Sequence, residues 1–170
     1  MNIKLLELDK TLKNFLTTIL LVLAAGVVVG LAYLNLTTDF SPEGTTLRFN
    51  GNADETTTAE FEIPENFPKT VSEMLITTHN HIFGFSFLFF ITGIIYYFNS
   101  IINGFWKSFF LIEPIISILV TFGSIWLMRY IDEDFVYLTI FSSIVLYLSF
   151  FFMASVSVYE MKFKKITVSN

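Results

Sequence analysis

The stretch FFLIEPIISILVTFGSIWLM (109–128), RYIDED (129–134) and FVYLTIFSSIVLYLSFFFMASVSV (135–158) decides the fold of this chain. Each apolar run reaches the roughly 20 residues that a helix needs to cross a bilayer. The connection between the two runs is only residues 129–134. A connection that short predicts that the runs form an antiparallel helical hairpin.

Two further apolar runs, 15–36 and 74–98, contain no Asp, Glu, Lys or Arg. With the two runs of the hairpin they cover more than half of the 170 residues. The first run exceeds the roughly 7–15 apolar residues of a signal peptide, so we expect a retained anchor. The pattern predicts an all-α membrane protein with one domain over 1–170. We expect a four-transmembrane-helix antiparallel bundle with one sizeable loop, 37–73.

The composition agrees with a membrane protein and excludes several other classes. Hydrophobic residues make up 54% and charged residues 15%, against the roughly 25% charge of an ordinary soluble domain. The apolar bias is wrong for a disordered chain, and the net charge of −5 is wrong for a nucleic-acid binder. The chain has no Cys, which excludes disulfides and thiolate metal sites.

The distribution of charge predicts which loops lie on which side of the membrane. Seven Lys residues fall in the N-terminal arm, the second loop and the tail, whereas the other side carries only Arg48, Lys69 and Arg129. Cytoplasmic loops carry the excess of Lys and Arg. We therefore expect an inner-membrane protein of a bacterium with both termini cytoplasmic. Loops 37–73 and 129–134, which hold 11 of the 15 acids, would then be periplasmic.

Loop 37–73 contains a pattern that is typical of a β-hairpin. Thr45–Phe49 and Thr57–Ile63 partly alternate polar and apolar residues, and Asn50-Gly51 stands between them. Asn-Gly is a strong hairpin turn signal. We expect a short hairpin here, with a solvated acidic loop as the alternative.

Both histidines of the chain, His79 and His81, fall near the periplasmic end of the second span. Polar residues in a span usually face the bundle interior or a cavity. Residues two apart point about 200° apart on a helix, so the pair cannot bind one metal unless the helix unwinds. Three interpretations stay open: structural hydrogen bonds, ligation of haem b or a divalent metal, and quinone or proton handling.

The turn after the third span adds charged groups at a similar depth. Arg129 is followed by Asp132, Glu133 and Asp134. Asp132 and Asp134 with the histidines would form an oxygen-and-imidazole set that suits a divalent metal. The alternative is an interfacial Arg129 beside a solvated acidic turn.

Glu113-Pro114 lies within the third span and has two readings. Proline suits the first helical position, where Glu113 would cap the free amides and the helix would begin. Alternatively the helix continues through a kink and Glu113 is a buried polar group that faces the bundle, because an acid among lipid is costly. In the first span, Gly26 and Gly30 form a small-xxx-small stripe that favours close helix packing.

The chain resembles a family of small four-span bacterial membrane proteins, frequent in Bacteroidota, whose members often carry the ill-fitting label "elongation factor-1 alpha". The chain has no GTP-binding loop. The resemblance implies a shared four-span fold and a shared His-x-His segment, but no activity. It rests on Thr38–Gly44, Pro68–Leu75, Thr78–His81, Ile112–Pro114 and Gly123–Arg129.

From these features we expect a non-enzymatic subunit that acts as an accessory or assembly component of a larger membrane complex. Its partners would be the lipid bilayer and other membrane-protein subunits, and not nucleic acid; a homo-oligomer stays open. A redox module that binds haem b or a metal through His79 or His81 is one alternative. A small channel or transporter, with Glu113 and the two histidines on one polar path, is the other.

Overall fold

The computed structural model describes residues 4–51 and 67–164, and in these ranges every regular element is a helix. The elements are η1 (Leu5–Glu7), α1 (Lys10–Thr38), α2 (Pro42–Asn50), α3 (Val71–Tyr97), α4 (Gly104–Tyr130) and α5 (Phe135–Lys162). The four long helices, α1, α3, α4 and α5, are long and apolar enough to cross a membrane. This confirms an all-helical membrane protein with four candidate spans.

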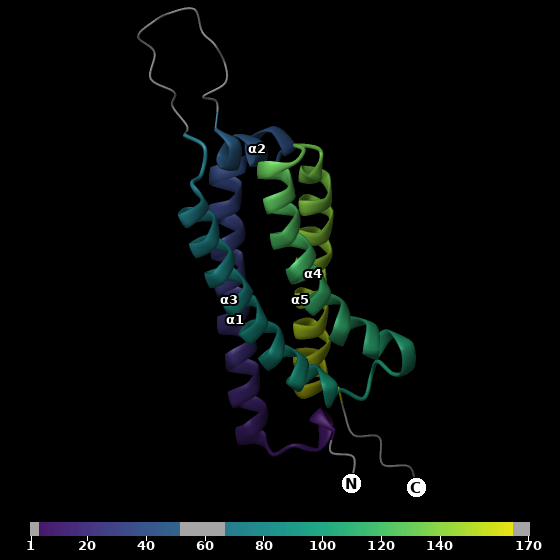
Figure 1. Ribbon diagram of the computed structural model, residues 1–170. Coiled ribbons are helices and arrows are strands. Elements are labelled where there is room, and N and C mark those ends of the chain that lie inside the picture. Colours follow the sequence, from purple (N-terminus) through teal and green to yellow (C-terminus); the bar gives the residue numbers. More distant parts are fainter. Residues whose placement is uncertain (1–3, 52–66, 165–170) are drawn as a thin grey trace, which may run out of the picture.

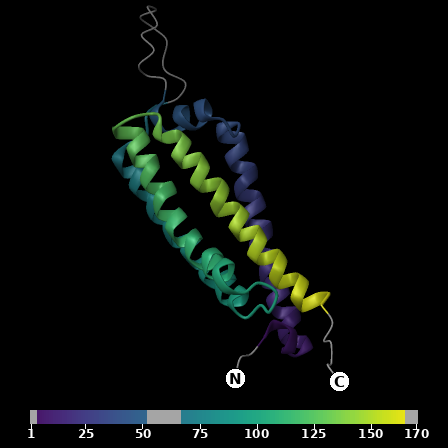
Figure 2. The ribbon, with the colours of Figure 1, turned by 90° about the vertical axis from the view of Figure 1, so that its right-hand side faces the viewer.

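The long helices lie alongside one another, and α2 lies across one end of them (Figure 1). That end, which we call the α2 end, also carries the short turn between α4 and α5. The described chain starts with η1 and finishes with α5 at the opposite end, which we call the terminal end (Figure 1). Figure 2 shows α5 between α4 and α1, in line with the contacts of α5 with both helices.

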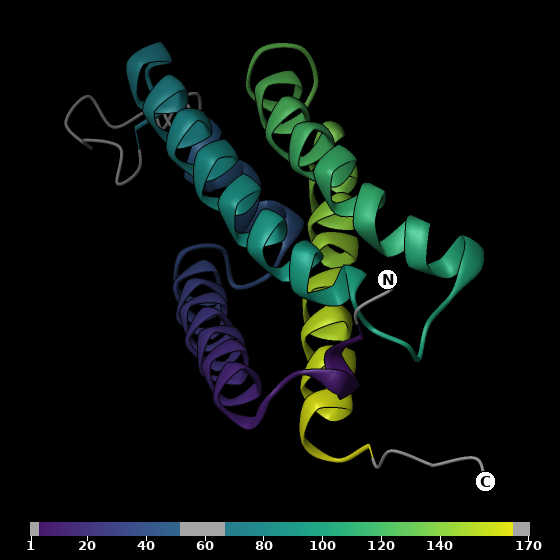
Figure 3. The same cartoon turned by 90° about the horizontal axis from the view of Figure 1, so that it is seen from below.

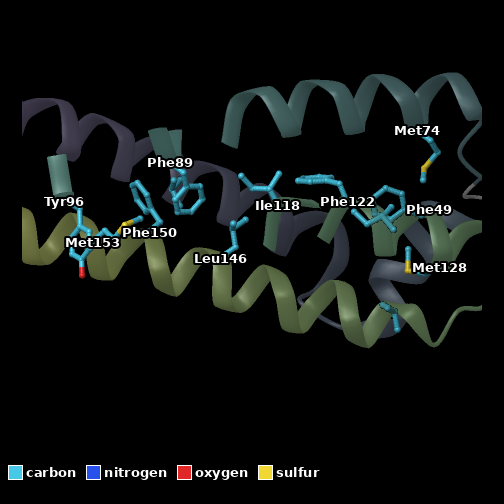
Figure 4. Close-up of a cluster of buried hydrophobic side chains, with 13 residues drawn as sticks. Phe49, Met74, Phe89, Tyr96, Ile118, Phe122, Met128, Leu146, Phe150 and Met153 are labelled. Atoms are coloured by element: carbon cyan, nitrogen blue, oxygen red, sulfur yellow. The ribbon is translucent and has the colours of Figure 1, made fainter. Parts of the chain in front are cut away.

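The hydrophobic core lies between α3, α4 and α5 (Figure 4). Ile118 and Phe122 from α4 meet Leu146 and Phe150 from α5, and Phe89 from α3 packs edge-on against Phe150 with ring centroids 6.3 Å apart. Large apolar side chains also cover the outside of the molecule; Val29 is 69% exposed and Leu148 is 64% exposed. Such a surface is stable in contact with lipid chains and not in contact with water.

Helix α1 is attached to the rest more loosely than the other long helices. It packs against α5 and α2 but makes little contact with α3. Figure 3, seen from the terminal end, shows α1 standing apart from α4, with α3 and α5 on either side of the space between them. The end of α1 is held close to α2. Thr38 at this end is buried, and Ser41, the N-cap of α2, follows three residues later.

The expected β-hairpin is wrong for its first half, because Thr45–Phe49 lies inside helix α2. Ser41 caps this helix by accepting a hydrogen bond from the Gly44 amide at 2.9 Å, and Pro42 takes the first turn. Gly51, with φ of 71°, ends the helix. The sequence signals were therefore a helix N-cap and a glycine C-cap, not two turns. The second half, Thr57–Ile63, lies outside the described residues.

Helix α4 is continuous through Pro114, so the helix does not begin at that proline. A proline inside a helix removes one backbone hydrogen bond and clashes with the preceding turn. Figures 1 and 3 show the result: the first half of α4 leans away from α5, whereas the second half runs along it. The structure thus favours the kinked-span reading of Glu113-Pro114.

Candidate functional site

The described molecule has a half-open groove of about 700 Å³. Its walls come from α1, α3 and α5, α4 lies behind it, and α2 closes it at the α2 end. The volume is within the range of about 300–1,000 Å³ that is typical of small-molecule sites. Protein interiors are normally packed to the density of organic crystals. We therefore expect a space of this size in a small helical protein to be filled by a bound molecule.

Glycines without side chains widen the groove on two of its walls, those of α1 and α3. Gly26 and Gly30 of α1 and Gly84 of α3 all line it. A Cβ atom added at any of the three would meet nothing within 4 Å. The small-xxx-small stripe of α1 therefore faces the groove, and no helix of the described chain packs on it. The close packing that the stripe favours is available to a molecule from outside.

Polar side chains gather at the α2 end of the groove. Arg48 of α2 is the one charged residue among the described residues that line it. Its Nη2 donates a hydrogen bond to the Tyr33 hydroxyl at 3.1 Å, and its guanidinium lies 5.0 Å from the centre of the Tyr33 ring. Both contacts hold the guanidinium of Arg48 at the α2 end of the groove. Thr45, Thr77 and Asn80 line the same end.

The far part of the groove is apolar. Val22 and Leu23 of α1, Leu88 of α3 and Leu146 of α5 line it there. Val22 and Leu34, which both line the groove, are about 18 Å apart along α1 at about 1.5 Å per residue. The groove is therefore long, with one polar, positively charged end and one apolar end.

The structure separates the two histidines. His81 lines the groove, and its ring centroid lies 5.2 Å from that of Phe122. Its Nδ1 is 2.8 Å from the Thr77 carbonyl oxygen, which requires Nδ1 to carry the proton and leaves Nε2 as the acceptor of the neutral ring. Both side chains are exposed, but His79 does not line the groove and packs against Phe83 with ring centroids 4.8 Å apart.

The predicted metal-ligating residues do not come together in the part of the chain that is described. No three His, Asp or Glu residues there are grouped closely enough to hold a metal ion. Asp132 instead accepts a hydrogen bond from the Asp134 amide at 2.9 Å within the α4–α5 turn. Arg129 lies with its guanidinium 5.2 Å from the Tyr130 ring centre. Binding of haem b or a metal at these residues stays a prediction.

Glu113 lies at the α4–α5 interface within a row of polar side chains, which we call the polar seam. Its Oε2 accepts a hydrogen bond from Ser149 at 2.7 Å, and its Oε1 accepts one from Ser117. Farther toward the α2 end, Thr121 donates to Ser142 at 2.8 Å. The seam consists of Glu113, Ser117, Thr121 and Ser124 of α4 with Thr139, Ser142 and Ser149 of α5.

The partners of Glu113 were missed by the sequence reading, although a signal was present. Ser117, Thr121 and Ser124 recur every three or four residues, and Thr139 and Ser142 do the same on the next run. That spacing places them on one helix face. Hydrogen bonds between such faces are a usual means of joining transmembrane helices.

A second acid, Glu160, was missed entirely. Its side chain is 0% exposed, and it accepts hydrogen bonds from the Ser100 amide at 2.6 Å and the Ser100 hydroxyl at 2.7 Å. Lys164 also donates to the Ser100 hydroxyl, at 2.9 Å. These bonds tie the α3–α4 connection to the end of α5. The sequence gives little warning, because Glu160 follows the apolar run and reads as part of a solvated tail.

Comparison with known proteins agrees with this class of structure. Residues 39–167 match the sequence model of the Aq_1264_TM family, which is described as a transmembrane helical domain. The match covers most of the chain, so this protein is an integral membrane protein. It belongs to the Aq_1264_TM family. No curated protein and no solved structure matches the chain significantly.

Proposed function

We propose that this protein is a non-enzymatic, accessory or assembly component of a larger complex in a bacterial inner membrane. We further propose that the groove is the surface through which it binds a membrane-embedded partner group. The observation that carries this proposal is the glycine-walled groove, which lies open between α1, α3 and α5. Leucine or valine at the three glycines would fill that space from within the chain.

The proposal includes a topology. Its four long helices form an antiparallel bundle in the bilayer, with the terminal end cytoplasmic and the α2 end periplasmic. The uneven distribution of Lys and Arg supports this orientation. Under this topology the α2 end of the groove, with Arg48 and Tyr33, lies at the level of the outer leaflet.

The accessory role is tested by filling the groove. Gly26→Leu and Gly30→Leu add bulk to the α1 wall, where nothing else lies within 4 Å, so the bundle itself should fold. Gly123→Leu is the matched control, because Gly123 of α4 is equally open but does not line the groove. We expect wild-type protein and Gly123→Leu to migrate within a larger assembly after mild extraction from native membranes.

In the same experiment, Gly26→Leu and Gly30→Leu should migrate mostly as free protein. Wild-type protein that extracts as a monodisperse, partner-free species would contradict the accessory role. Unchanged assembly of both groove variants would show that the partner binds another surface. A self-associated species of one chain would replace the larger complex by a homo-oligomer.

A small channel or transporter is the second candidate, and the polar seam favours it. Glu113 and six Ser or Thr residues follow one helix interface toward the α2 end. Ionisable groups within spans often mark ion or proton paths. In proteoliposomes, a proton or cation flux through this path should fall at least tenfold in Glu113→Gln, and an unchanged flux would exclude the seam as the path.

A further inference from the structure

We propose that the groove binds one phospholipid with an anionic headgroup, with its phosphate at Arg48 and an acyl chain along α1 toward Val22 and Leu88. This inference rests on the proposed function, in which the groove is a binding surface, and it names the group bound there as a phospholipid that lies between this chain and the larger complex. The argument depends on three features: the charge of the lining, its gradient of polarity, and the closed α2 end.

The charge of the lining selects an anionic group. Arg48 is the one charged side chain among the described lining residues, and no Asp or Glu stands among them. The two loops at the α2 end hold 11 of the 15 acids of the chain, so Arg48 is a cation within an otherwise acidic end. Arginine presents several donors in a planar fork that matches phosphate oxygens. The contact with Tyr33 already fixes the guanidinium in place, which reduces the entropy lost on binding.

The gradient of polarity matches an amphiphile. Thr77, Asn80 and the Nε2 atom of His81 can hydrogen-bond a headgroup or its glycerol near Arg48. The lining toward Val22, Leu23 and Leu146 is mainly aliphatic, and Tyr147 adds one hydroxyl beside Leu146. A hydrocarbon chain gains free energy on leaving water, but nothing comparable on leaving other lipid. The headgroup contacts must therefore supply most of the selectivity.

The closed α2 end favours a lipid over a transmembrane helix of a partner. Helix α2 lies across the end of the groove, and Thr45, Arg48 and Phe49 line it from that side. A helix that crosses the whole membrane would have to continue past α2. An acyl chain ends inside the bilayer, and its headgroup can turn outward through the open side of the groove beside α2. The open space beside Gly26, Gly30 and Gly84 accommodates the acyl chain.

The test is lipid retention by the full-length protein, measured by native mass spectrometry in detergent. Delipidated protein is titrated with dioleoylphosphatidylglycerol or with dioleoylphosphatidylcholine. We expect one tightly bound phosphatidylglycerol per chain and about tenfold weaker binding of phosphatidylcholine, because the choline cation of phosphatidylcholine offsets the negative charge of its phosphate in front of Arg48. Equal binding of the two lipids would overturn the proposal.

Variants separate the headgroup site from the fold. Arg48→Gln should weaken phosphatidylglycerol binding about tenfold, to the level of phosphatidylcholine, and Arg48→Lys, which keeps the charge but not the planar fork, should restore part of it. Arg129→Gln is the matched control, because Arg129 stands at the same end but does not line the groove. Tyr33→Phe keeps the charge and should keep the headgroup preference. Unchanged phosphatidylglycerol binding in Arg48→Gln would overturn the headgroup assignment.

The path of the acyl chain is tested with two variants. Gly30→Leu should lose the bound lipid, whereas Gly123→Leu should retain it. Retention by both would place the lipid elsewhere and overturn the proposal. Because the chain has no Cys, Gly30→Cys also accepts a photo-cross-linker at a single site in native membranes. We expect an adduct of lipid mass; a polypeptide adduct would overturn the lipid assignment while supporting the accessory role. Lipid binding without any larger assembly would support the lipid assignment and contradict the accessory role.

Discussion

At the scale of single residues, the buried Glu160 and the half-buried Glu113 have different roles. Glu160 holds the α3–α4 connection against α5 through Ser100. Glu113 joins α4 to α5 through Ser149 and Ser117. Sequence reading found Glu113 because it interrupts an apolar run, and it missed Glu160 because nothing in the local pattern distinguishes a buried acid from a solvated one. Its burial depends on the approach of Ser100, which lies 60 positions away in the chain.

Glu160→Ala should destabilise the protein, because two donors of Ser100 would lose their acceptor in a buried place. We expect a cost of about 1–3 kcal/mol, as found for unsatisfied buried polar groups. The exposed Glu7 offers the control, and Glu7→Ala should change stability by less than about 0.5 kcal/mol. Thermal unfolding in detergent measures both. Equal unfolding temperatures for the two variants would contradict the role given to Glu160.

The hydrogen bond between Glu113 and Ser149 should appear as a coupling energy in a double-mutant cycle. From Glu113→Gln and Ser149→Ala we expect about 0.6 kcal/mol, and at most about 1.7 kcal/mol, as measured between membrane helices. Ser155 of α5 is exposed, so the cycle of Glu113→Gln with Ser155→Ala should give no coupling. The cycle is read from unfolding free energies in mixed micelles. No coupling with Ser149 would contradict the seam contact.

At the scale of helices, the four apolar runs were predictable and their ends were less so. Run length and hydropathy alone locate the long helices, and α5 begins at Phe135 as expected. The other long helices begin several residues earlier than the apolar runs, because capping side chains such as Asp9 and Thr70 extend them past the apolar part. Helix α2 was predicted as a strand because Ser41-Pro42 and Asn50-Gly51 serve helix caps and turns alike.

The bend in α4 gives a prediction at this scale. Pro114→Ala restores the missing backbone donor, so the first half of α4 should straighten toward the axis of the second half. Spin labels at Phe105→Cys and Tyr159→Cys, both at exposed positions, report the separation of α4 from the end of α5. We expect a changed and narrower distance distribution in the alanine variant. An identical distribution with and without Pro114 would attribute the bend to tertiary contacts instead.

At the scale of the whole molecule, composition and charge predicted the class of protein but not the groove. A groove depends on how helices from distant parts of the sequence are spaced, and α1 stands away from α3 for reasons that local patterns do not contain. Gly26 and Gly30 were noticed, and their spacing predicts a close contact. The structure places them on the groove wall, where the contact is open to an outside molecule.

The proposed topology has a direct check, since single cysteines can be placed at both ends of a chain that has none. Glu43→Cys lies on α2 and Asn103→Cys on the α3–α4 connection, and both positions are exposed. In intact cells a membrane-impermeant maleimide that enters the periplasm should label Glu43→Cys and spare Asn103→Cys. Labelling in the reverse order would place the α2 end in the cytoplasm.

The central claim is that the groove has an occupant from outside the chain. The most direct measurement is the native mass spectrum of the wild-type protein after mild extraction from its own membrane, compared with Gly30→Leu and Gly123→Leu. The account predicts that the chain, once released from its assembly in the gas phase, carries one anionic phospholipid in the wild type and in Gly123→Leu, and none in Gly30→Leu. A wild-type protein that carries neither lipid nor partner, or an occupant that remains in Gly30→Leu, would contradict it.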